Sequence, residues 1–185
     1  MKKRQRQAVV AELSKQMAAS DSWCGETHLQ KSVFVLQEVL LVPTGFNYTL
    51  YKYGPFSRDL RAELSGMRAD GFLDVVVQSP PYGPRLLISD ASKEQLLRRW
   101  QKTLSLYKPQ IEFVVERLGS KMGVEALERL TTALWMRSRQ SESSELEQAE
   151  RISEAKPHVS IEQALEAIGE AKQLEAEALQ AASSA

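Results

Sequence analysis

Residues 26–41 constrain the possible folds of this chain more than any other segment. Their apolar side chains do not follow a single stripe of a helix but cover most of its circumference: Leu29, Val33, Phe34, Val35, Leu36, Val39, Leu40 and Leu41. A helix that is apolar on nearly every side needs neighbours on nearly every side. We therefore expect a helix over residues 26–41 at the centre of the fold, ended by Pro43 and Gly45.

Smaller elements are expected around this central helix. The periodicity of the apolar residues predicts a helix over about 4–19, a short strand within 46–53, a helix over about 58–69 and a β-hairpin over 72–89. Gly54 and Pro55 predict a turn after the strand. Ser57 predicts the N-cap of the following helix, because its hydroxyl can accept a hydrogen bond from a free amide of the first turn. The order helix, helix, strand, helix, hairpin is typical of a winged helix.

After residue 90 the sequence predicts helices. Ser92 and Gln95 have the spacing of a capping box, which indicates that a helix begins there. Pro109 fits the first turn of another helix, where its missing amide has no partner to lose. The polar residues 137–144 indicate a loop before the last part of the chain.

The last predicted helix begins at a second capping box, formed by Ser160 and Gln163. Its expected docking stripe consists of Ile161, Leu165 and Ile168. The sequence as a whole predicts a mainly α fold with a small β-hairpin. We expect a winged-helix-like domain over residues 1–90, a C-terminal helical region over 91–179 packed on it, and a disordered tail over 180–185.

The charges are distributed unevenly, although the formal net charge is zero. Residues 1–140 carry 21 Lys and Arg against 14 Asp and Glu, and residues 141–185 carry 3 against 10. This division indicates a basic body with an acidic C-terminal region. No apolar run is long enough for a bilayer span or a secretory signal, and a single cysteine forms no internal disulfide. We therefore expect a cytoplasmic protein without membrane contact.

Few residues suggest catalysis. Cys24 lies four residues before His28, which brings a thiol and a base close in sequence, but no third residue completes a catalytic set. His158 is the other histidine of the chain, and two histidines with one cysteine are too few for the common zinc patterns. No glycine-rich phosphate loop is present. We expect a protein without catalytic residues, cofactor or metal.

Three segments share their order and spacing with one known family. They are residues 28–37 with a Leu-Gln-Lys motif, residues 51–60 with Tyr53, Gly54, Pro55, Phe56 and Ser57, and residues 155–162 with a Lys-Pro-His-Val-Ser motif. On these segments the chain resembles the YwgA-like proteins of bacteria and archaea, a largely uncharacterised family with a winged-helix core. The middle segment also resembles, more distantly, the Panacea domain of toxin-neutralising proteins. We expect a structural role for that segment, because Gly54 and Pro55 suit a turn that leads into a helix.

A protein partner is the binding target that the sequence favours. Pro81 and Tyr82 lie in a proline-rich loop of the expected hairpin and would present an aromatic anchor on a stiff segment. The last helix adds many glutamates and a narrow apolar stripe that could lie on a partner. Together with the distant resemblance, this predicts a bacterial regulatory or toxin-neutralising component whose partner is a toxin or defence effector. The oligomeric state stays open.

DNA is the alternative target. Arg58, Arg61 and Arg68 fall on one arc of the helix that enters the major groove in winged-helix proteins. Lys52 and Arg85 flank this helix from the strand and the hairpin. An N-terminal arm could add phosphate contacts through Lys2, Lys3, Arg4 and Arg6. Against this hypothesis stand three acids on the same segment, Asp59, Glu63 and Asp70, and a pI of about 6.8, which is low for a DNA-binding domain.

Overall fold

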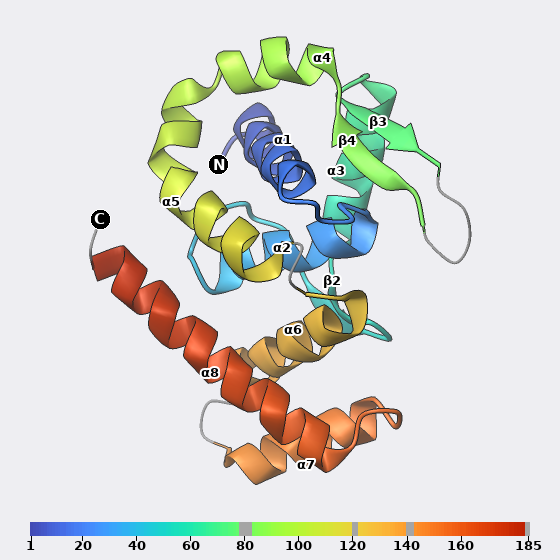
Figure 1. The fold of residues 1–185 in the computed structure, drawn as a ribbon, viewed down its shortest axis with the longest axis vertical. Coiled ribbons are helices and arrows are strands. Elements are labelled where there is room, and N and C mark those ends of the chain that lie inside the picture. Colours follow the sequence, from blue (N-terminus) through green and yellow to red (C-terminus); the bar gives the residue numbers. More distant parts are fainter. Residues whose placement is uncertain (78–82, 120–121, 140–142, 184–185) are drawn as a thin grey trace.

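The computed structural model describes residues 1–77, 83–119, 122–139 and 143–183 of the chain. It is mainly helical, with two small antiparallel hairpins (Figure 1). In chain order the elements are α1 (Lys3–Ala19), α2 (Glu26–Glu38), β1 (Thr49–Tyr51), β2 (Gly54–Phe56), α3 (Arg58–Ala69), β3 (Leu73–Val76), β4 (Arg85–Ile88), α4 (Asp90–Ser92), the π-helical segment η1 (Lys93–Arg98), α5 (Gln101–Leu118), α6 (Val124–Arg139), α7 (Glu145–Ala155) and α8 (Ile161–Ser183). The expected mainly α class is confirmed, with a second hairpin that was not predicted.

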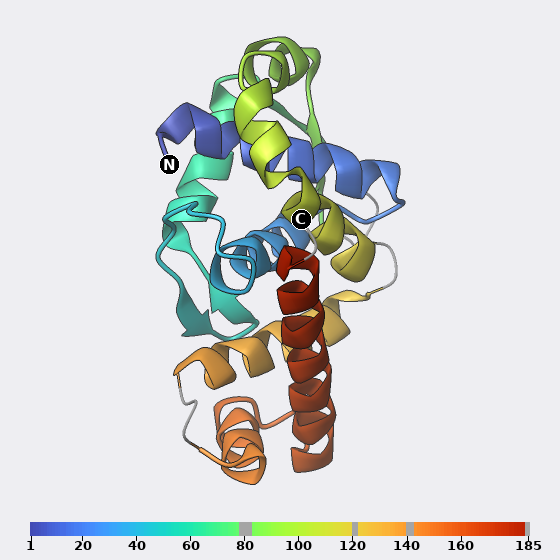
Figure 2. The ribbon, with the colours of Figure 1, turned by 90° about the vertical axis from the view of Figure 1, so that its left-hand side faces the viewer.

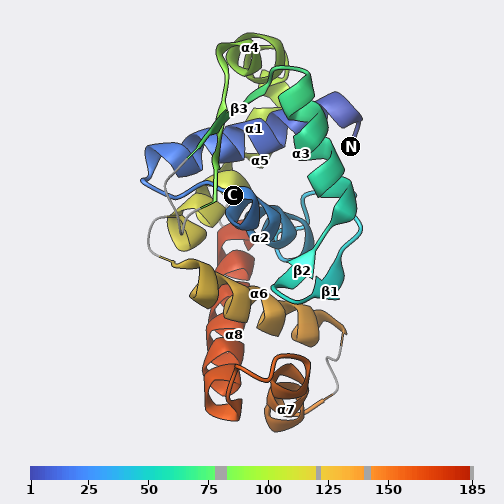
Figure 3. The same ribbon diagram turned by 90° about the vertical axis from the view of Figure 1, so that its right-hand side faces the viewer.

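Helix α2 occupies the centre of the fold. Every residue from His28 to Leu36 is buried, and the helix contacts α1, α3, α5, α6 and β2 (Figure 3). The expected central helix is thereby confirmed, although it ends at Glu38 and not at residue 41. Leu41 takes a left-handed conformation with a φ of 55°, and the amide of Val42 donates to the carbonyl oxygen of Leu36. This arrangement closes the helix early.

The first hairpin corrects the prediction for the segment after α2. The strand expected within residues 46–53 is confined to β1, and Gly54, predicted in a turn, pairs with Tyr51 as the first residue of β2. The two strands are instead joined through Lys52 and Tyr53. Proline is tolerated in β2 because each strand of an isolated hairpin has a free edge, to which a missing amide can face.

The second hairpin forms as predicted. Strands β3 and β4 are antiparallel, with Leu73 opposite Ile88 at the base. We call this hairpin the wing. Its connecting loop includes Pro81 and Tyr82, the predicted partner anchors, and these two residues lie outside the described ranges.

The chain before α2 adds a third short partner to the wing. Gly25 forms an isolated antiparallel bridge with Arg85 on β4. Beside it, the amide of Leu86 donates to the carbonyl oxygen of Cys24 at 2.9 Å. Strand β4 is therefore hydrogen-bonded on both of its edges, which ties the base of the wing to the start of the central helix.

Helix α3 lies where the sequence predicts it. The Ser57 hydroxyl accepts a hydrogen bond from the amide of Leu60 at 3.1 Å, so the predicted N-cap is confirmed. After the helix, Gly71 takes a left-handed conformation with a φ of 70° and leads into β3. Both ends of α3 are thus fixed by local turn chemistry.

The segment between the wing and α6 differs from its prediction at two places. The capping box predicted at Ser92 does not form: η1 begins directly after Ser92, but the Ser92 hydroxyl donates to the carbonyl oxygen of Phe72 at 2.5 Å, and the serine that caps a helix start here is Ser89, before α4. Pro109 lies inside the continuous helix α5 and not in a first turn. Because proline has no amide N–H, the carbonyl oxygen of Ser105 lacks its usual helical donor. Both residues are exposed, so water can replace the lost hydrogen bond.

Helix α6 is longer than predicted. It continues to Arg139, so the loop expected over residues 137–144 begins later than the sequence suggests. Helix α7 begins at a capping box in which the Ser144 hydroxyl accepts from the amide of Glu147 at 3.3 Å. Both α6 and α7 contact the long helix α8, which crosses them (Figure 2).

Helix α8 starts as predicted but docks through a different face. The amide of Gln163 donates to the Ser160 hydroxyl at 3.2 Å, and the amide of Ser160 donates to Gln163 Oε1 at 3.1 Å. Ile168 is fully buried, but Ile161 and Leu165 of the predicted stripe are 42% and 37% exposed. The rest of the buried face consists mostly of small residues: Ala164, Ala167, Ala171, Leu174 and Ala178. Such small side chains let the helix lie close to α6 and α7.

The end of α8 also differs from its prediction. The helix runs to Ser183, whereas a disordered tail was expected from residue 180, and residues 184–185 lie outside the described ranges. Two glutamates of α8 form ion pairs with the body, Glu175 with Arg137 at 2.7 Å and Glu177 with Arg117 at 3.0 Å. Part of the acidic C-terminal charge is therefore matched by basic residues of α5 and α6.

Candidate binding face around helix α3

Helix α3 has one arginine-rich face and one face that docks on the body. The exposed positions include Arg58, Arg61, Ser65 and Arg68, and the buried apolar positions are Leu60, Leu64 and Met67. The predicted division of this helix is confirmed. Figure 3 shows α3 on the side of the molecule that also presents β3 and the β1–β2 hairpin.

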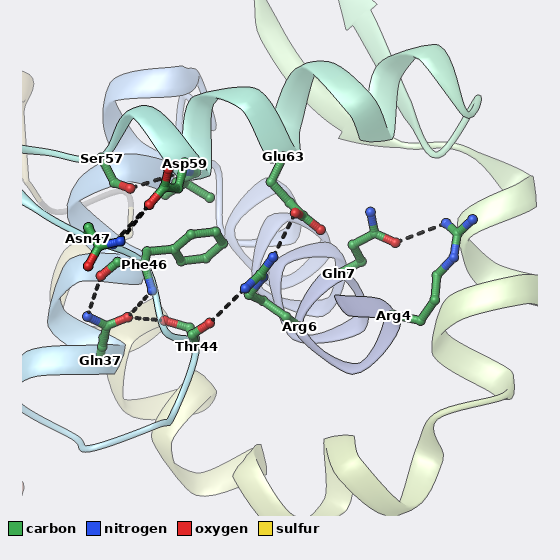
Figure 4. A network of polar contacts seen from close by, with 11 residues as sticks. Arg4, Arg6, Gln7, Gln37, Thr44, Phe46, Asn47, Ser57, Asp59 and Glu63 are labelled. Atoms are coloured by element: carbon green, nitrogen blue, oxygen red, sulfur yellow. Dashed lines mark hydrogen bonds and ion pairs between the residues drawn. The ribbon is translucent and has the colours of Figure 1, made fainter. Parts of the chain in front are cut away.

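Two acids of this segment are engaged by residues of the body (Figure 4). Glu63 Oε2 lies 2.9 Å from Arg6 Nη2, and both side chains are largely buried. Asp59 Oδ2 accepts a hydrogen bond from the Asn47 side-chain amide at 2.9 Å. Both carboxylates are therefore engaged by partners other than the arginines of α3, although Glu63 Oε1 is buried without a hydrogen-bond partner among the described residues.

The third acid of the segment is paired as well. Asp70 Oδ2 lies 3.2 Å from Arg4 Nη1, and the Arg4 guanidinium lies over the ring of Phe72 at 4.9 Å. Arg6 likewise lies over the ring of Phe46 at 4.5 Å. Helix α1 directs the side chains of Arg4 and Arg6 onto the body, and Arg6 is largely buried there, so the predicted phosphate-binding arm stays a prediction.

The arginines of α3 differ in how far they are neutralised. Arg61 Nε lies 3.5 Å from Glu26 Oε1 on α2, and both side chains are well exposed, which makes this a weak pair. Among the described residues, Arg58 and Arg68 form no ion pair or side-chain hydrogen bond. Two guanidinium groups of the exposed face are thus available to a ligand.

The two flanking basic residues are placed differently from each other. Lys52 is exposed between β1 and β2, with its ammonium 5.2 Å from the centre of the Tyr53 ring. Arg85 is half-buried on β4, and its guanidinium donates to the carbonyl oxygen of Ser22 at 3.4 Å. Lys52 faces solvent near α6 and the segment before α8, and it lines neither cavity beside α3. Arg85 is held against the connection between α1 and α2.

A cleft of about 560 Å³, which we call the wing cleft, lies between α3, the start of α2, the wing and the start of α6. Arg61, Ser65 and Arg68 of α3 line one wall. Apolar residues line much of the remainder: Trp23, Leu64, Pro84, Leu86, Met122 and Val124. A volume of this size can hold a few side chains of a partner or one small molecule.

A second cavity of about 630 Å³, the hairpin pocket, lies between α2, the start of α3 and the β1–β2 hairpin. Its lining includes the aromatic rings of Tyr51, Tyr53 and Phe56, the hydroxyls of Thr27 and Thr49, and the cations Lys31, Arg58 and Arg61. Arg61 and Glu26 border both cavities. The exposed face of α3 therefore has one cavity on each side.

The three motifs of the family resemblance meet in space at residues 52–57. The Gln30 side chain accepts from the amide of Ser57 and donates to its carbonyl oxygen, both at 3.0 Å. Lys31 Nζ donates to the carbonyl oxygen of Pro55 at 2.8 Å. Lys156 Nζ donates to the carbonyl oxygen of Lys52 at 2.8 Å. Side chains from the first and third motifs thus hold the backbone of the second.

This junction places two lysines inside the protein. Lys31 and Lys156 are 2% and 3% exposed, and no carboxylate of the described residues lies within 4.0 Å of either ammonium. Burial lowers the pKa of Lys31 to about 8, an effect that Glu128 opposes and Lys156 reinforces. Burial also lowers the pKa of Lys156 and raises the pKa of Glu128. Two buried ammonium groups therefore share one partly buried carboxylate.

Lys31 belongs to the Leu-Gln-Lys motif but was not among the site residues predicted from the sequence. A signal was present, because Lys31 is a lysine within a helix that is otherwise apolar around most of its circumference. A charged residue at such a position is buried at a cost unless it has a specific partner. Its contact with the residue 52–57 segment depends on a fold that brings distant segments together.

The candidate thiol and base near α2 are held apart from each other. Cys24 is fully buried, and its Sγ forms hydrogen bonds at 3.4 Å with Ser14 and the carbonyl oxygen of Leu86. Burial raises the pKa of the Cys24 thiol, which disfavours the nucleophilic thiolate. Burial also lowers the pKa of His28, which lines the wing cleft. The geometry offers no thiol–imidazole contact among the described residues.

Two further observations concern metals and membranes. Within residues 1–77, 83–119, 122–139 and 143–183, no three His, Cys, Asp or Glu side chains are grouped so that they could hold a metal ion. Over the same ranges, no helix has the length and apolar character needed to span a bilayer.

No protein-family model matches the chain, and no curated protein matches it either. The resemblance to the YwgA-like proteins therefore stays a prediction. It rests on three sequence motifs, of which the first and third supply side chains that hydrogen-bond to the backbone of residues 52–57.

Proposed function

We propose that this protein is a non-enzymatic binding protein of the winged-helix type that acts through a protein partner held in the wing cleft. The order α1, α2, α3, β3, β4 supports the winged-helix assignment. The bridge between Gly25 and Arg85 supports it further, because it adds a short third strand beside β4. By analogy with the distant family resemblance, the partner is a toxin or defence effector that this protein neutralises or regulates.

The apolar lining of the wing cleft beside the arginines of α3 is the observation that carries this proposal. Trp23, Leu64 and Leu86 give the cleft an apolar character, and Arg61 and Arg68 place positive charge in its wall. A protein segment can fill such a cleft with an apolar side chain and pair acidic neighbours with the arginines. Duplex DNA offers no comparable apolar group, apart from the methyl group of thymine.

Exposed apolar residues are also present on and directly after β3 of the wing. Val75 and Val76 are 36% and 38% exposed, and Val77 is 83% exposed. Contiguous apolar positions at the surface are more typical of a protein interface than of a phosphate-contacting wing. The proposed partner therefore bears an apolar anchor flanked by acidic residues and an apolar patch that covers β3.

The test compares two substitutions on neighbouring turns of α3. Ser65 lines the wing cleft, whereas Ala62 is also exposed but lines neither cavity. A partner is first identified by cross-linking to the wild-type protein in the host cell, and binding is then measured with the purified pair. We expect Ser65→Trp to weaken binding at least tenfold by filling the cleft, and Ala62→Trp to change it by less than about threefold. Equal effects of the two substitutions would contradict the cleft as the binding site.

DNA binding through α3 is the second candidate function. It is favoured by one observation, the engagement of Asp59, Glu63 and Asp70 by body residues while Arg58 and Arg68 have no partner among the described residues. In this alternative the exposed face of α3 would enter the major groove, with the wing beside it. The affinity for DNA would then depend more on the local surplus of cations on that face than on the net charge of zero.

Anisotropy of labelled duplex DNA, measured over a range of salt concentrations, tests the second candidate. If α3 contacts phosphates, Arg58→Ala and Arg68→Ala should each reduce the slope of log affinity against log salt by about 0.9. Ala62→Trp should abolish the binding, because residue 62 would lie inside the groove. An absence of binding at low salt would exclude DNA as a target of this face.

A further inference from the structure

We propose that the hairpin pocket binds a small organic anion, with the Lys31 ammonium as the counter-charge at its floor. This site lies on the other side of α3 from the wing cleft, and its function does not depend on a protein partner. The ligand class is a carboxylate or a phosphate ester attached to a planar or apolar group.

Lys31 is positioned at the hairpin pocket. Its side chain lines the pocket, and so does Gly54 on β2. A Cβ built on Gly54 would lie 3.3 Å from Lys31 Nζ and 3.1 Å from the Thr132 hydroxyl. Gly54 also has a φ of 84°, which other residues rarely adopt. Glycine at this position lets β2 lie close to both the Lys31 ammonium and helix α6, whose Glu128 carbonyl oxygen would be 3.4 Å from that Cβ.

The charge of Lys31 supports the proposal as well. Its ammonium has three N–H donors, and among the described residues one acceptor is recorded, the carbonyl oxygen of Pro55. The Glu128 carboxylate favours the charged form of Lys31, but it lies beyond ion-pair distance and also favours the charged form of Lys156. A buried cation without a direct anionic partner is unfavourable, and an anion in the pocket would supply that partner.

A purely structural role leaves the charge of Lys31 unexplained. The neighbouring Gln30 holds the backbone of Ser57 with two hydrogen bonds from an uncharged amide. A neutral donor would serve equally well for the carbonyl oxygen of Pro55 and would avoid the cost of burying a charge. The positive charge of Lys31 is therefore not needed to fix the backbone of residues 52–57.

The walls of the pocket indicate the remainder of the ligand. Arg58 and Arg61 lie at the start of α3 and add positive charge, while the one acid in the lining, Glu26, is already paired with Arg61. Tyr51 and Phe56, with ring centres 5.9 Å apart, offer apolar faces against which a planar group can pack. A volume of about 630 Å³ fits a metabolite-sized molecule.

Binding should be linked to the protonation of Lys31. Because the pKa of Lys31 is about 8 in the empty pocket, part of the protein carries a neutral amine at pH 8. An anion favours the ammonium form, so binding should take up protons near pH 8, and affinity should fall about tenfold from pH 7 to pH 9. The charged and titratable groups around Lys31 on all packed elements are Glu26, Tyr51, Tyr53, Arg58, Arg61, Glu128 and Lys156.

Calorimetric titration of the full chain tests the proposal with benzoate, phenyl phosphate and inorganic phosphate as probes. We expect saturable binding of at least one organic anion, with a proton uptake that is revealed at pH 8 by two buffers of different ionisation enthalpy. Benzoate bound in preference to phenyl phosphate would assign a carboxylate ligand, and the opposite order a phosphate ester. Binding of inorganic phosphate as tight as that of either organic probe would contradict a ligand with a planar or apolar group.

Two variants separate the site from general charge effects. Lys31→Met should abolish the binding and the proton uptake, whereas Lys52→Met, which removes an exposed lysine outside the pocket lining, should change neither. If Lys31→Met fails to fold, Arg58→Gln at the exposed rim should still weaken binding about fivefold. The proposal is overturned if none of the three probes binds saturably, or if binding is independent of pH between 7 and 9.

Discussion

On α3, Arg58 and Arg68 have no ionic partner among the described residues, whereas on α5 and α6 the arginines Arg117 and Arg137 are paired with glutamates of α8. Both regions are rich in charges of both signs, and their sequences do not reveal this difference. In the C-terminal region the charges fasten one helix to another. On α3 the acids are engaged by the body and the arginines face outward, so the charges are available for binding.

The difference follows from what lies opposite each helix. Helix α8 packs along α6 and α7, so its polar residues at the edge of the contact meet polar residues of the neighbouring helices. No helix in the described part of the chain packs on the outer face of α3, which is bordered by the wing cleft and the hairpin pocket. The packed helices therefore pair their charges, whereas Arg58 and Arg68, which border the cavities, have no ionic partner among the described residues.

The largest expected effect is on the stability of the C-terminal region. Ile168→Ala should lower the free energy of unfolding by about 3 kcal/mol, because a fully buried side chain is replaced by a cavity. Ile161→Ala, at a position that is 42% exposed, should cost less than about 1 kcal/mol. Urea denaturation of both variants measures the difference. Similar losses would mean that α8 docks through the stripe predicted from the sequence.

A pH effect comes next and concerns the junction between the two regions. The pKa of Lys31 is lowered from 10.5 to about 8 on folding, so between these values the unfolded chain binds more protons than the folded one. This group therefore makes stability rise with pH from about 8 to 10.5, by on the order of 3 kcal/mol.

Comparison with Lys31→Met isolates this contribution from those of other groups. Burial raises the pKa of Tyr48 and Cys24, and these groups make stability fall at high pH. The difference between wild type and variant, from denaturation at pH 8 and pH 10.5, should therefore show the rise. A difference that stays constant with pH would mean that Lys31 is not desolvated in the folded protein.

A smaller effect is expected within the α3 region itself. Glu63→Ala should destabilise the protein by about 2 kcal/mol, because it leaves the largely buried Arg6 without its carboxylate. Asp70→Ala removes the exposed partner of Arg4 and should cost less than about 1 kcal/mol. Thermal unfolding of both variants measures these losses. If Glu63→Ala left the stability unchanged, the acids of α3 would not stabilise the fold. The proposed contrast between these acids and the arginines of α3 would then be wrong.

Local signals in the sequence predicted the elements well and their contacts less well. The Ser57 cap, the Gly71 turn and the alternation of apolar residues suffice for α3 and the wing, because these elements depend on nearby residues. The docking face of α8 was predicted wrongly, because large apolar residues were assumed to face inward and the alanines between them were overlooked.

The candidate sites depend on contacts that no local pattern contains. The arginine face of α3 follows from helical spacing, but the engagement of Glu63 by Arg6 and of Asp59 by Asn47 requires the packed fold. The hairpin pocket likewise depends on a contact between distant residues, because Lys31 on α2 donates a hydrogen bond to Pro55 on β2, more than twenty residues later. The sequence predicted a turn at Gly54 and Pro55 and therefore gave no reason to expect this contact, but the two residues belong to strand β2.

The most direct test of the contrast between the two regions measures thermal unfolding and partner binding together on two double variants. One is Arg61→Ala with Arg68→Ala, which removes the arginines in the wall of the wing cleft, and the other is Arg117→Ala with Arg137→Ala. We expect the α3 variant to lose partner affinity at least tenfold while its melting temperature changes by less than about 2 °C. The C-terminal variant should keep its affinity and melt several degrees lower, since 1 kcal/mol corresponds to about 2–4 °C in a protein of this size. A loss of stability in the α3 variant with unchanged affinity would contradict the proposed division between binding charges and structural charges.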